Sequence, residues 1–383
     1  MRITLPFVFL QCAALSVASV ISPHSMPPGV ARDSAVPKAR IDRLSRGANI
    51  TQWFQVYGRA SDDHYRTYMG DDEIAMIRRM GLRHVRLCFS PQYLYDPENP
   101  DVPIAEHLGD LQDAIGRLIA RDLAVVLDPH NTNQQRIEDD AKWAGGYPRF
   151  WGALAARLKR FSPDMLLFEV VNEPVFNKRE AEWFALQEKI VAAIRKSAPE
   201  HTIVATGANW GGIDGLRKLT PLSDRNVVYS FHFYDPFTFT HQGATWSGRV
   251  PPLLKGIPYP SSPEAVTEAL SRIADAEARG WVEDYGKKRW DRARLKTRLN
   301  EVLAWGREHS VPLYCGEFGV FPKNAPPESR ANWFRDFALV LKESGVGYAV
   351  WGWDDGFGFS RRRQDGKVVL DPVPIEALGL NKP

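Results

Sequence analysis

Residues Phe168–Pro174 have the sequence FEVVNEP, a short apolar run that ends in an amide, a carboxyl and a proline. This pattern predicts a buried β-strand that passes into a loop at Asn172 and Glu173. A second stretch, Val311–Val320 (VPLYCGEFGV), is built in the same way and ends at Glu317. Two acids at the ends of two buried strands indicate one site that is assembled from distant parts of the chain.

Short apolar segments alternate with longer amphipathic segments from Arg46 onward, which is typical of βα units around a parallel sheet. The expected strands are Gly47–Trp53, His84–Ser90, Leu123–His130, Met165–Glu173, His201–Ala208, Asn226–Tyr234, Val311–Gly319 and Val346–Trp353. Eight such units over roughly 340 residues predict the α/β class and a single (β/α)8 TIM barrel. The main alternative is a doubly wound open sheet, which would show a glycine-rich phosphate turn after an early strand. The first strand ends instead in QWFQ, at residues 52–55.

Helices are expected between the strands, and one connection is unusually long. The expected helices are Asp71–Met80, Ala105–Arg121, a segment near Pro148–Arg160, Ala181–Ser197, a short helix before Pro221, helices across Pro263–Arg307 and one near Ser329–Glu343. A segment rich in Gly, Pro and Trp, Asp235–Ser262, follows the sixth strand and has no regular period.

In a barrel the functional side chains lie at the carboxyl ends of the strands, and here most of these ends carry polar or aromatic groups. The candidate residues are Arg86, His130, Asn172, Glu173, His232, Tyr234, Glu317 and Trp351. His232 and Tyr234 have the same parity in their strand and therefore face the same side, with Phe231 and Phe233 on the other. A buried Arg86 needs carboxylate partners, and Glu169 is a candidate.

Each candidate also has a structural interpretation. Arg86 could lie on the surface, a single histidine could be a hydrogen-bonded core residue, and Trp351 could serve only in packing. Asp128, Asp354 and Asp355 are better explained as loop caps or supporting groups than as catalysts. We expect neither a metal nor another cofactor, because the sequence contains no HxH or HExxH motif and the candidate histidines lie singly on separate strands.

Two carboxyls are sufficient for glycoside hydrolysis. Retaining glycosidases hold them ~5–5.5 Å apart, so that one attacks the anomeric carbon while the other protonates the leaving oxygen. Glu173 lies in a cleft that becomes dry around substrate, which suits the acid. Glu317, supported by Arg86 and by a hydrogen bond from Tyr234, suits the ionised nucleophile.

In this order on successive strands, the eight candidates resemble glycoside hydrolase family 5, the cellulase family of retaining (β/α)8 enzymes. The resemblance covers the chain after its N-terminal leader. It implies that Glu173 is the acid/base and Glu317 the nucleophile. It also implies supporting roles: Asn172 holds the sugar 2-hydroxyl, His130 and Trp351 line the subsite of the cleaved sugar, His232 supports the acid/base, and Tyr234 and Arg86 hold the nucleophile.

The sequence is compatible with several glycan substrates. The segments His232–Trp246 (HFYDPFTFTHQGATW) and Arg46–Phe54 (RGANITQWF) look most like bacterial endo-β-1,4-glucanases, which implies cellulose or a related β-glucan as substrate. Alternatives are a β-mannanase, an exo-β-1,3-glucanase or a non-catalytic carbohydrate-binding barrel. Indole faces suit sugar rings, so four tryptophans on the same rim are candidate sugar platforms, with loop packing as the alternative: Trp53, Trp210, Trp246 and Trp353.

The remaining predictions concern the N-terminus, the partners, the oligomeric state and the location of the protein. Residues 1–22 form an expected signal peptide, with a buried or anchoring segment as the alternative. Residues 23–45 are an expected disordered leader, and residues 46–383 form the catalytic domain. A net charge of +3 without a long basic run excludes a nucleic-acid groove. We expect a monomer that is secreted or periplasmic and makes no membrane contact after signal cleavage.

Overall fold

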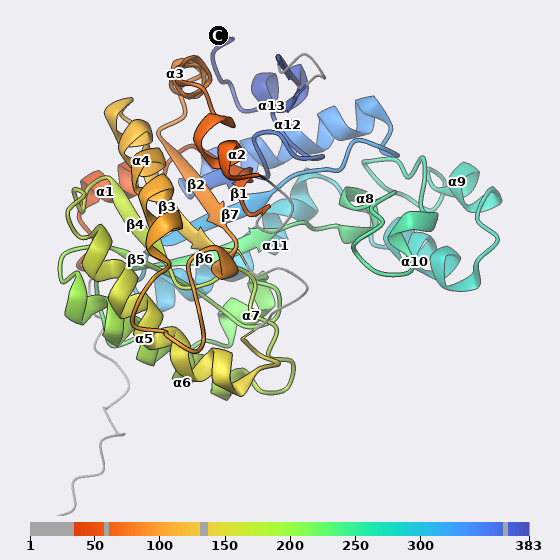
Figure 1. The fold of residues 1–383 in the computed structure, drawn as a ribbon. Helices are drawn as coiled ribbons and strands as arrows, with labels where there is room; N and C mark the ends of the chain where they lie inside the picture. Colours follow the sequence, from red (N-terminus) through yellow and green to blue (C-terminus); the bar gives the residue numbers. More distant parts are fainter. Residues whose placement is uncertain (1–33, 57–60, 131–136, 363–366, 383) are drawn as a thin grey trace, which may run out of the picture. The chain divides into compact units, whose positions relative to one another are not determined.

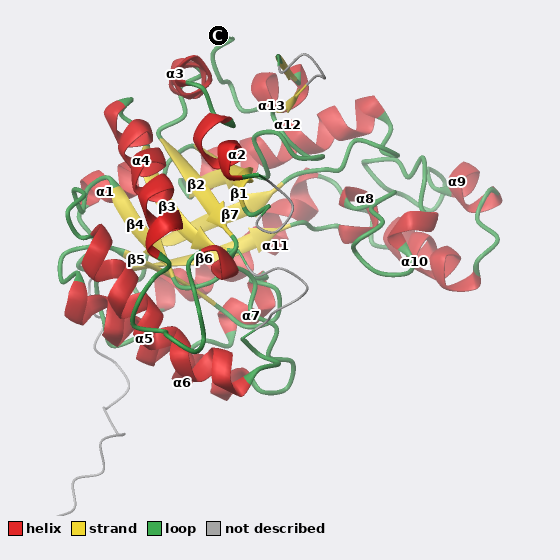
Figure 2. Ribbon diagram, viewed as in Figure 1, coloured by secondary structure: helices red, strands yellow, loops and turns green. Residues whose placement is uncertain are grey.

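The structure of the protein is a computed structural model that describes residues 34–56, 61–130, 137–362 and 367–382. Within these residues, eight parallel strands follow one another in sequence order and close into a barrel (Figures 1 and 2). The strands are β1 (Gly47–Phe54), β2 (His84–Phe89), β3 (Ala124–Pro129), β4 (Leu166–Glu169), β5 (Ile203–Thr206), β6 (Val227–Phe233), β7 (Leu313–Phe318) and β8 (Gly347–Val350). The predicted (β/α)8 class is confirmed.

Helices occupy the connections between the strands and lie around the barrel (Figure 2). They are α1 (Lys38–Arg43), α2 (Asp62–Thr67), α3 (Asp71–Arg79), η1 (Pro91–Tyr93), α4 (Ala105–Ala120), α5 (Ala141–Leu158), α6 (Glu180–Ser197), α7 (Ile213–Arg217), α8 (Phe237–Thr240), η2 (Pro251–Leu253), α9 (Thr267–Ser271), α10 (Ala276–Lys287), α11 (Arg292–Glu308), α12 (Pro327–Ser344) and α13 (Pro372–Ala377). A small antiparallel pair, β9 (Ser360–Arg362) and β10 (Val368–Leu370), was not expected.

Helix α5 begins earlier than predicted. The sequence places its start near Pro148, but the helix begins at Ala141 and includes Pro148 in its interior. The carboxyl of Asp140 caps it by accepting hydrogen bonds from the backbone N–H groups of Lys142 and Trp143. This cap and the buried face that includes Trp143 stabilise the first turns. The helix therefore tolerates the loss of the backbone hydrogen bond that Pro148 cannot donate.

The two faces of the strands pack against different neighbours. Phe231 and Phe233 belong to the large apolar cluster between the strands and the helices. His232, between them in the sequence, lies on the interior side, with its Nδ1 atom 3.5 Å from Glu317. The predicted division of β6 into an apolar outer face and a polar inner face is therefore confirmed.

The end of the predicted leader is folded, and it closes the amino-terminal end of the barrel. Leu44, at the end of α1, is 2% exposed and belongs to an apolar cluster to which six strands contribute, through Val126, Leu167, Val204, Val228, Tyr314 and Ala349. The guanidinium of Arg40 donates to the backbone oxygen of Glu200 and to Asp164. The prediction of a disordered leader is wrong for residues 38–45, because apolar and cationic side chains that look isolated in the sequence meet complementary groups below the strands.

The long connection after β6 is ordered around a buried glutamine. The side-chain amide of Gln242 donates to the backbone oxygens of Phe239 and Ile257, and its carbonyl accepts from the Ile257 N–H. These three hydrogen bonds join two distant parts of a segment that has no regular period, and α8 and η2 are its only turns of helix within the described residues.

The expected signal peptide and residues 23–33 of the leader lie outside the described residues, so both stay predictions. Within the part of the chain that the structure describes, no helix combines the length and the apolar character needed to cross a membrane.

We predict that Leu44→Ala lowers the free energy of unfolding by about 2–5 kcal/mol, because it opens a cavity under the barrel. Leu339→Ala is the matched control: Leu339 is 37% exposed on α12, and its loss should be much smaller. Equilibrium denaturation in guanidinium chloride compares the two. Equal losses would show that residues 38–45 do not contribute to the folded barrel.

Candidate active site

Arg86 is fully buried inside the barrel and pairs with three carboxylates. Its Nε and Nη2 atoms form a bidentate pair with Glu169 at 2.7 and 2.9 Å. Nη1 donates to Glu317 Oε1 at 2.7 Å, and Nη2 lies 3.0 Å from Asp128 Oδ2. Burial opposes the charge of the guanidinium, but the three acids outweigh this effect and hold the pKa of Arg86 well above its usual value.

Two of the acids around Arg86, Glu169 and Asp128, have pKa values that shift in opposite directions. Burial raises the pKa of Glu169 to about 7, although Arg86 opposes this shift. For Asp128, burial acts in the same direction, but the charge of Arg86 and a hydrogen bond from His130 outweigh it and the pKa is lowered. One cation thus stabilises a group of acids whose proton affinities differ with their surroundings.

Two asparagines complete the contacts of Arg86 and link it to other strands. Asn49 Oδ1 accepts from Nη1 at 2.8 Å, while its amide donates to the backbone oxygens of Gly316 and Val350. Asn172 Oδ1 accepts from Nη2, also at 2.8 Å. Because a guanidinium can only donate, these contacts fix the orientation of both amides.

His130 takes its orientation from the same network. The Asn172 amide points to His130 Nε2 at 3.1 Å, and His130 Nδ1 lies 2.9 Å from Asp128 Oδ2. Nε2 is therefore the acceptor, and the proton on Nδ1 donates to Asp128. The indole of Trp351 stacks on the imidazole, with ring centroids 5.2 Å apart and planes 25° apart.

The two acids predicted to react both lie near one ring nitrogen of His232. Its Nδ1 atom is 2.8 Å from Glu173 Oε1 and 3.5 Å from Glu317 Oε2. The hydroxyl of Tyr234 donates to Glu317 Oε2 at 3.0 Å. One carboxylate oxygen each of Glu173 and Glu317, together with a His232 ring nitrogen, lie within 4.8 Å of one another. Burial lowers the pKa of His232 to about 4, so the ring is neutral at neutral pH and Nδ1 is its donor.

Glu173 reaches this position through an unusual backbone conformation. The predicted strand extends to Glu173, but β4 ends at Glu169, and the chain continues as a loop. Glu173 has a φ of 38°, in the left-handed region that costs a residue with a side chain about 1–3 kcal/mol. Such conformations persist where the surrounding structure holds them, and here His232 contacts the carboxyl.

Two of the four predicted sugar platforms are core residues. Trp53 and Trp353 are fully buried, and their indole N–H groups donate to the Tyr65 backbone oxygen and to Glu73. No face of either ring is open to a sugar, so the platform prediction is wrong for both. Trp210 and Trp246 are 53% and 57% exposed, which leaves their faces accessible.

Asn49 is a member of the Arg86 network that was not among the predicted site residues. It is fully buried and is the β1 residue that pairs in register with Arg86. The available signal was a polar residue inside an apolar strand next to a buried arginine.

Among the residues that the structure describes, two sets of side chains have the donor atoms for a metal ion: Glu173 with His232 and Glu317, and Cys88 with Asp128 and His130. Arg86 lies against both, 2.7 Å from Glu317 and 3.0 Å from Asp128. A second cation would meet electrostatic repulsion from this guanidinium at either place, so neither set is well suited to a metal.

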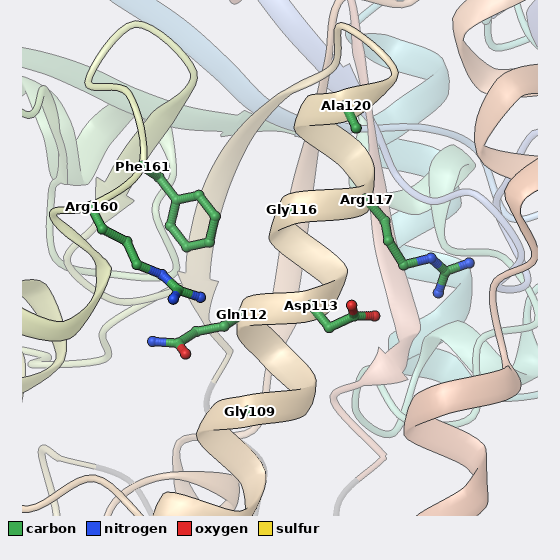
Figure 3. A pocket seen from close by; sticks show the side chains of 8 residues that line it. All are labelled: Gly109, Gln112, Asp113, Gly116, Arg117, Ala120, Arg160 and Phe161. Carbon is green, nitrogen blue, oxygen red and sulfur yellow. The ribbon is translucent and has the colours of Figure 1, made fainter.

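A surface hollow lies on the outer face of α4, away from the strand ends (Figure 3). It is lined by Gly109, Gln112, Asp113, Gly116, Arg117, Ala120, Arg160 and Phe161. None of the strand-end residues lines it, so the hollow is separate from the carboxylate pair.

Comparison with known proteins gives consistent matches. A family model described as cellulase (glycosyl hydrolase family 5) matches residues 45–356. Endoglucanase C of Acetivibrio thermocellus is 28% identical over 317 residues, which are 80% of this chain and 90% of that protein. Cel5A of Thermotoga maritima is 25% identical and has been solved with cellobiose and with a mannotriose substrate, at TM-scores of 0.71 and 0.70. These matches cover 90% and 89% of this chain and 99% of the Cel5A chains.

We predict that Arg86→Met lowers the free energy of unfolding by about 3–5 kcal/mol at pH 8, because it leaves buried carboxylates without their cation. The loss should be smaller at pH 5, where these carboxyls can take up protons. Denaturant unfolding at the two pH values measures both quantities.

Arg249→Met is the control, because Arg249 also pairs with two acids, Asp275 and Glu277, but its side chain is 59% exposed. Exposed ion pairs contribute about 0–1 kcal/mol. If Arg86→Met and Arg249→Met cost the same, the buried network is not what stabilises the barrel interior.

Proposed function

The chain belongs to the cellulase family, glycosyl hydrolase family 5, and from this we propose an endo-β-1,4-glucanase that cleaves cellulose or a related β-glucan with retention of anomeric configuration. Membership makes the protein a glycoside hydrolase. The observation that carries the retaining mechanism is the separation of Glu173 and Glu317, which have carboxylate oxygens within 4.8 Å of each other. Retaining enzymes hold their carboxyls ~5–5.5 Å apart, whereas inverting enzymes need ~6.5–9.5 Å to admit a water.

In the first step Glu317 is the nucleophile. Arg86 and Tyr234 donate to different oxygens of its carboxylate, which orients it and stabilises its negative charge. One oxygen attacks the anomeric carbon and forms an ester, while the bond from that carbon to the leaving oxygen breaks. Glu173 gives its proton to the leaving oxygen.

In the second step the same groups act in reverse. The ionised Glu173 takes a proton from a water molecule, whose oxygen attacks the anomeric carbon, and the ester bond to Glu317 breaks. A neutral His232 suits this cycle. Its Nδ1–H donates to Glu173 Oε1 without adding a positive charge, whereas an imidazolium would favour the ionised acid.

The choice of a β-1,4-glucan is supported by the endoglucanase relatives and by the exposed rings of Trp210 and Trp246. The backbone N–H of Trp210 donates to the backbone oxygen of Pro174, which places this residue next to the loop of Glu173. The mannotriose complex of Cel5A makes β-1,4-mannan the second candidate substrate.

We predict that the protein releases reducing sugars from carboxymethylcellulose faster than from mannan or laminarin, and that EDTA does not change the rate. A rapid fall in viscosity at low sugar release indicates endo action. Higher activity on mannan would replace the proposed substrate, and inactivity on all three glycans would contradict the proposed function.

The two acids should respond differently to replacement by alanine. With an activated aryl glycoside, Glu317→Ala should lose turnover and be rescued by azide as the inverted glycosyl azide. Glu173→Ala should lose about 10²–10⁴-fold on unactivated substrate and, with azide, give the retained product. Product anomers are assigned by NMR, with the exposed Glu343→Ala as control. The opposite stereochemistry would exchange the two roles.

A further inference from the structure

The loop after β8 is held by one carboxyl that the catalytic steps do not use. Asp355 Oδ1 accepts hydrogen bonds from the backbone N–H of Gly352 at 3.1 Å and from that of Phe357 at 3.0 Å. Gly352 directly follows Trp351. A single oxygen thus fixes the backbone at both ends of the turn 352–357.

The close approach of Asp355 requires a glycine at position 352. A β-carbon built on Gly352 would lie 2.6 Å from Asp355 Oδ2, which is too close for any side chain without a shift of the carboxyl. Oδ2 itself is buried and has no hydrogen-bond partner in the described part of the chain. The carboxyl is therefore packed against the backbone of the residue that follows Trp351.

Asp355 holds the backbone of Gly352, which follows Trp351, and of Phe357. Trp351 and Phe357 both contact aromatic rings of the site. Trp351 stacks on His130, as described above. Phe357 contacts the ring of Tyr234 with centroids 5.8 Å apart, and the exposed ring of Trp246 at 6.1 Å. A displacement of this turn would move both aromatic surfaces together.

We propose that Asp355 is a positioning residue of the sugar site, whose carboxyl fixes Trp351 and Phe357 through the turn between them and so sets substrate affinity. This inference rests on the proposed function only in its assumption that a sugar occupies the space beside Trp351. Asp355 need not touch the substrate, because both of its hydrogen bonds go to backbone N–H groups.

The charges around Asp355 add a pH dependence to this role. Burial, followed by the carboxylates of Asp354 and Glu317, raises the pKa of Asp355 to about 7, although the N–H groups of Phe357 and Gly352 lower it. Asp354 lies on the same turn and accepts from the Tyr68 hydroxyl, Glu317 comes from β7, and Tyr234 faces the group from the position directly after β6. Asp355 is thus neutral in weakly acidic solution, and its ionisation places a further negative charge near Glu317.

The sign of the effect on stability follows from the direction of the shift. An aspartate whose folded pKa lies above its unfolded value keeps its proton longer in the folded state. Its cost to stability is absent near pH 4, grows up to about pH 7 and is constant above. Asp355→Asn, which cannot ionise, should therefore gain stability over the wild type across this interval.

The experiment compares Asp355→Ala, Asp355→Asn and, as control, Asp291→Asn, which alters an aspartate that caps α11 outside the site. Asp355→Ala should raise KM for cello-oligosaccharides about tenfold, as expected for losing a hydrogen bond or two, with kcat changed far less. At pH 6, Asp355→Asn should keep the wild-type KM. Above pH 7 it should lack the change in KM that ionisation of Asp355 is expected to cause in the wild type. Equal falls in kcat for both Asp355 variants, or an unchanged KM in Asp355→Ala, would overturn the proposal.

A second measurement needs no substrate. Asp355→Ala should accelerate hydrogen exchange at the Gly352 and Phe357 amides, while Asp291→Asn should not. Unchanged exchange at both amides would show that Asp355 does not hold the turn. If the wild type cleaves no glycan, the proposed function fails, and exchange together with the pH-dependent stability of Asp355→Asn still decides the role of Asp355.

Discussion

The pairing of one buried guanidinium with three carboxylates is the interaction on which the barrel interior depends. A cation in an apolar core is very unfavourable alone, and so are three acids, but Arg86 satisfies Asp128, Glu169 and Glu317 together. Since Arg86 and its three partners come from four different strands, β2, β3, β4 and β7, the pairing also fixes how the strands align. The proposed nucleophile is one of these partners, so the network that stabilises the interior also orients the chemistry.

From Arg86 the hydrogen bonds continue outward to the substrate-facing groups. Asn172 carries the orientation to His130, on which Trp351 stacks, and Glu317 is linked through His232 to Glu173. Burial decreases along both paths, from the fully buried Arg86 to Trp351 and Glu173, which are partly exposed. Rigid supporting residues leave little freedom to the side chains that act on the sugar, which is the arrangement that preorganised catalysis requires.

The strand order and the strand-end residues were predictable because alternation and buried apolar runs are local properties of the sequence. The burial of the tryptophans at the strand ends was not predictable: Trp53 lies at the end of β1 and Trp210 follows β5, but only the contacts of the folded chain decide that one is core and the other exposed. The folded end of the leader was missed for the same reason, because its partners lie far away in sequence. Asp355 was predicted as a loop cap or supporting group, and its hydrogen bonds agree with this, but the sequence did not indicate that it holds the backbone of Gly352 and Phe357.

The described chain begins at the amino-terminal end of the barrel, which α1 and Leu44 close. Ala35 N–H donates to the backbone oxygen of Arg225, just before β6, and α1 then leads into Leu44 below the strands. The described chain therefore begins at the end opposite to the carboxylates. A support or a fusion partner joined ahead of residue 34 would be attached on the side away from the reacting pair. Immobilisation through the amino terminus thus suits work on an insoluble polymer, which has to approach the open end.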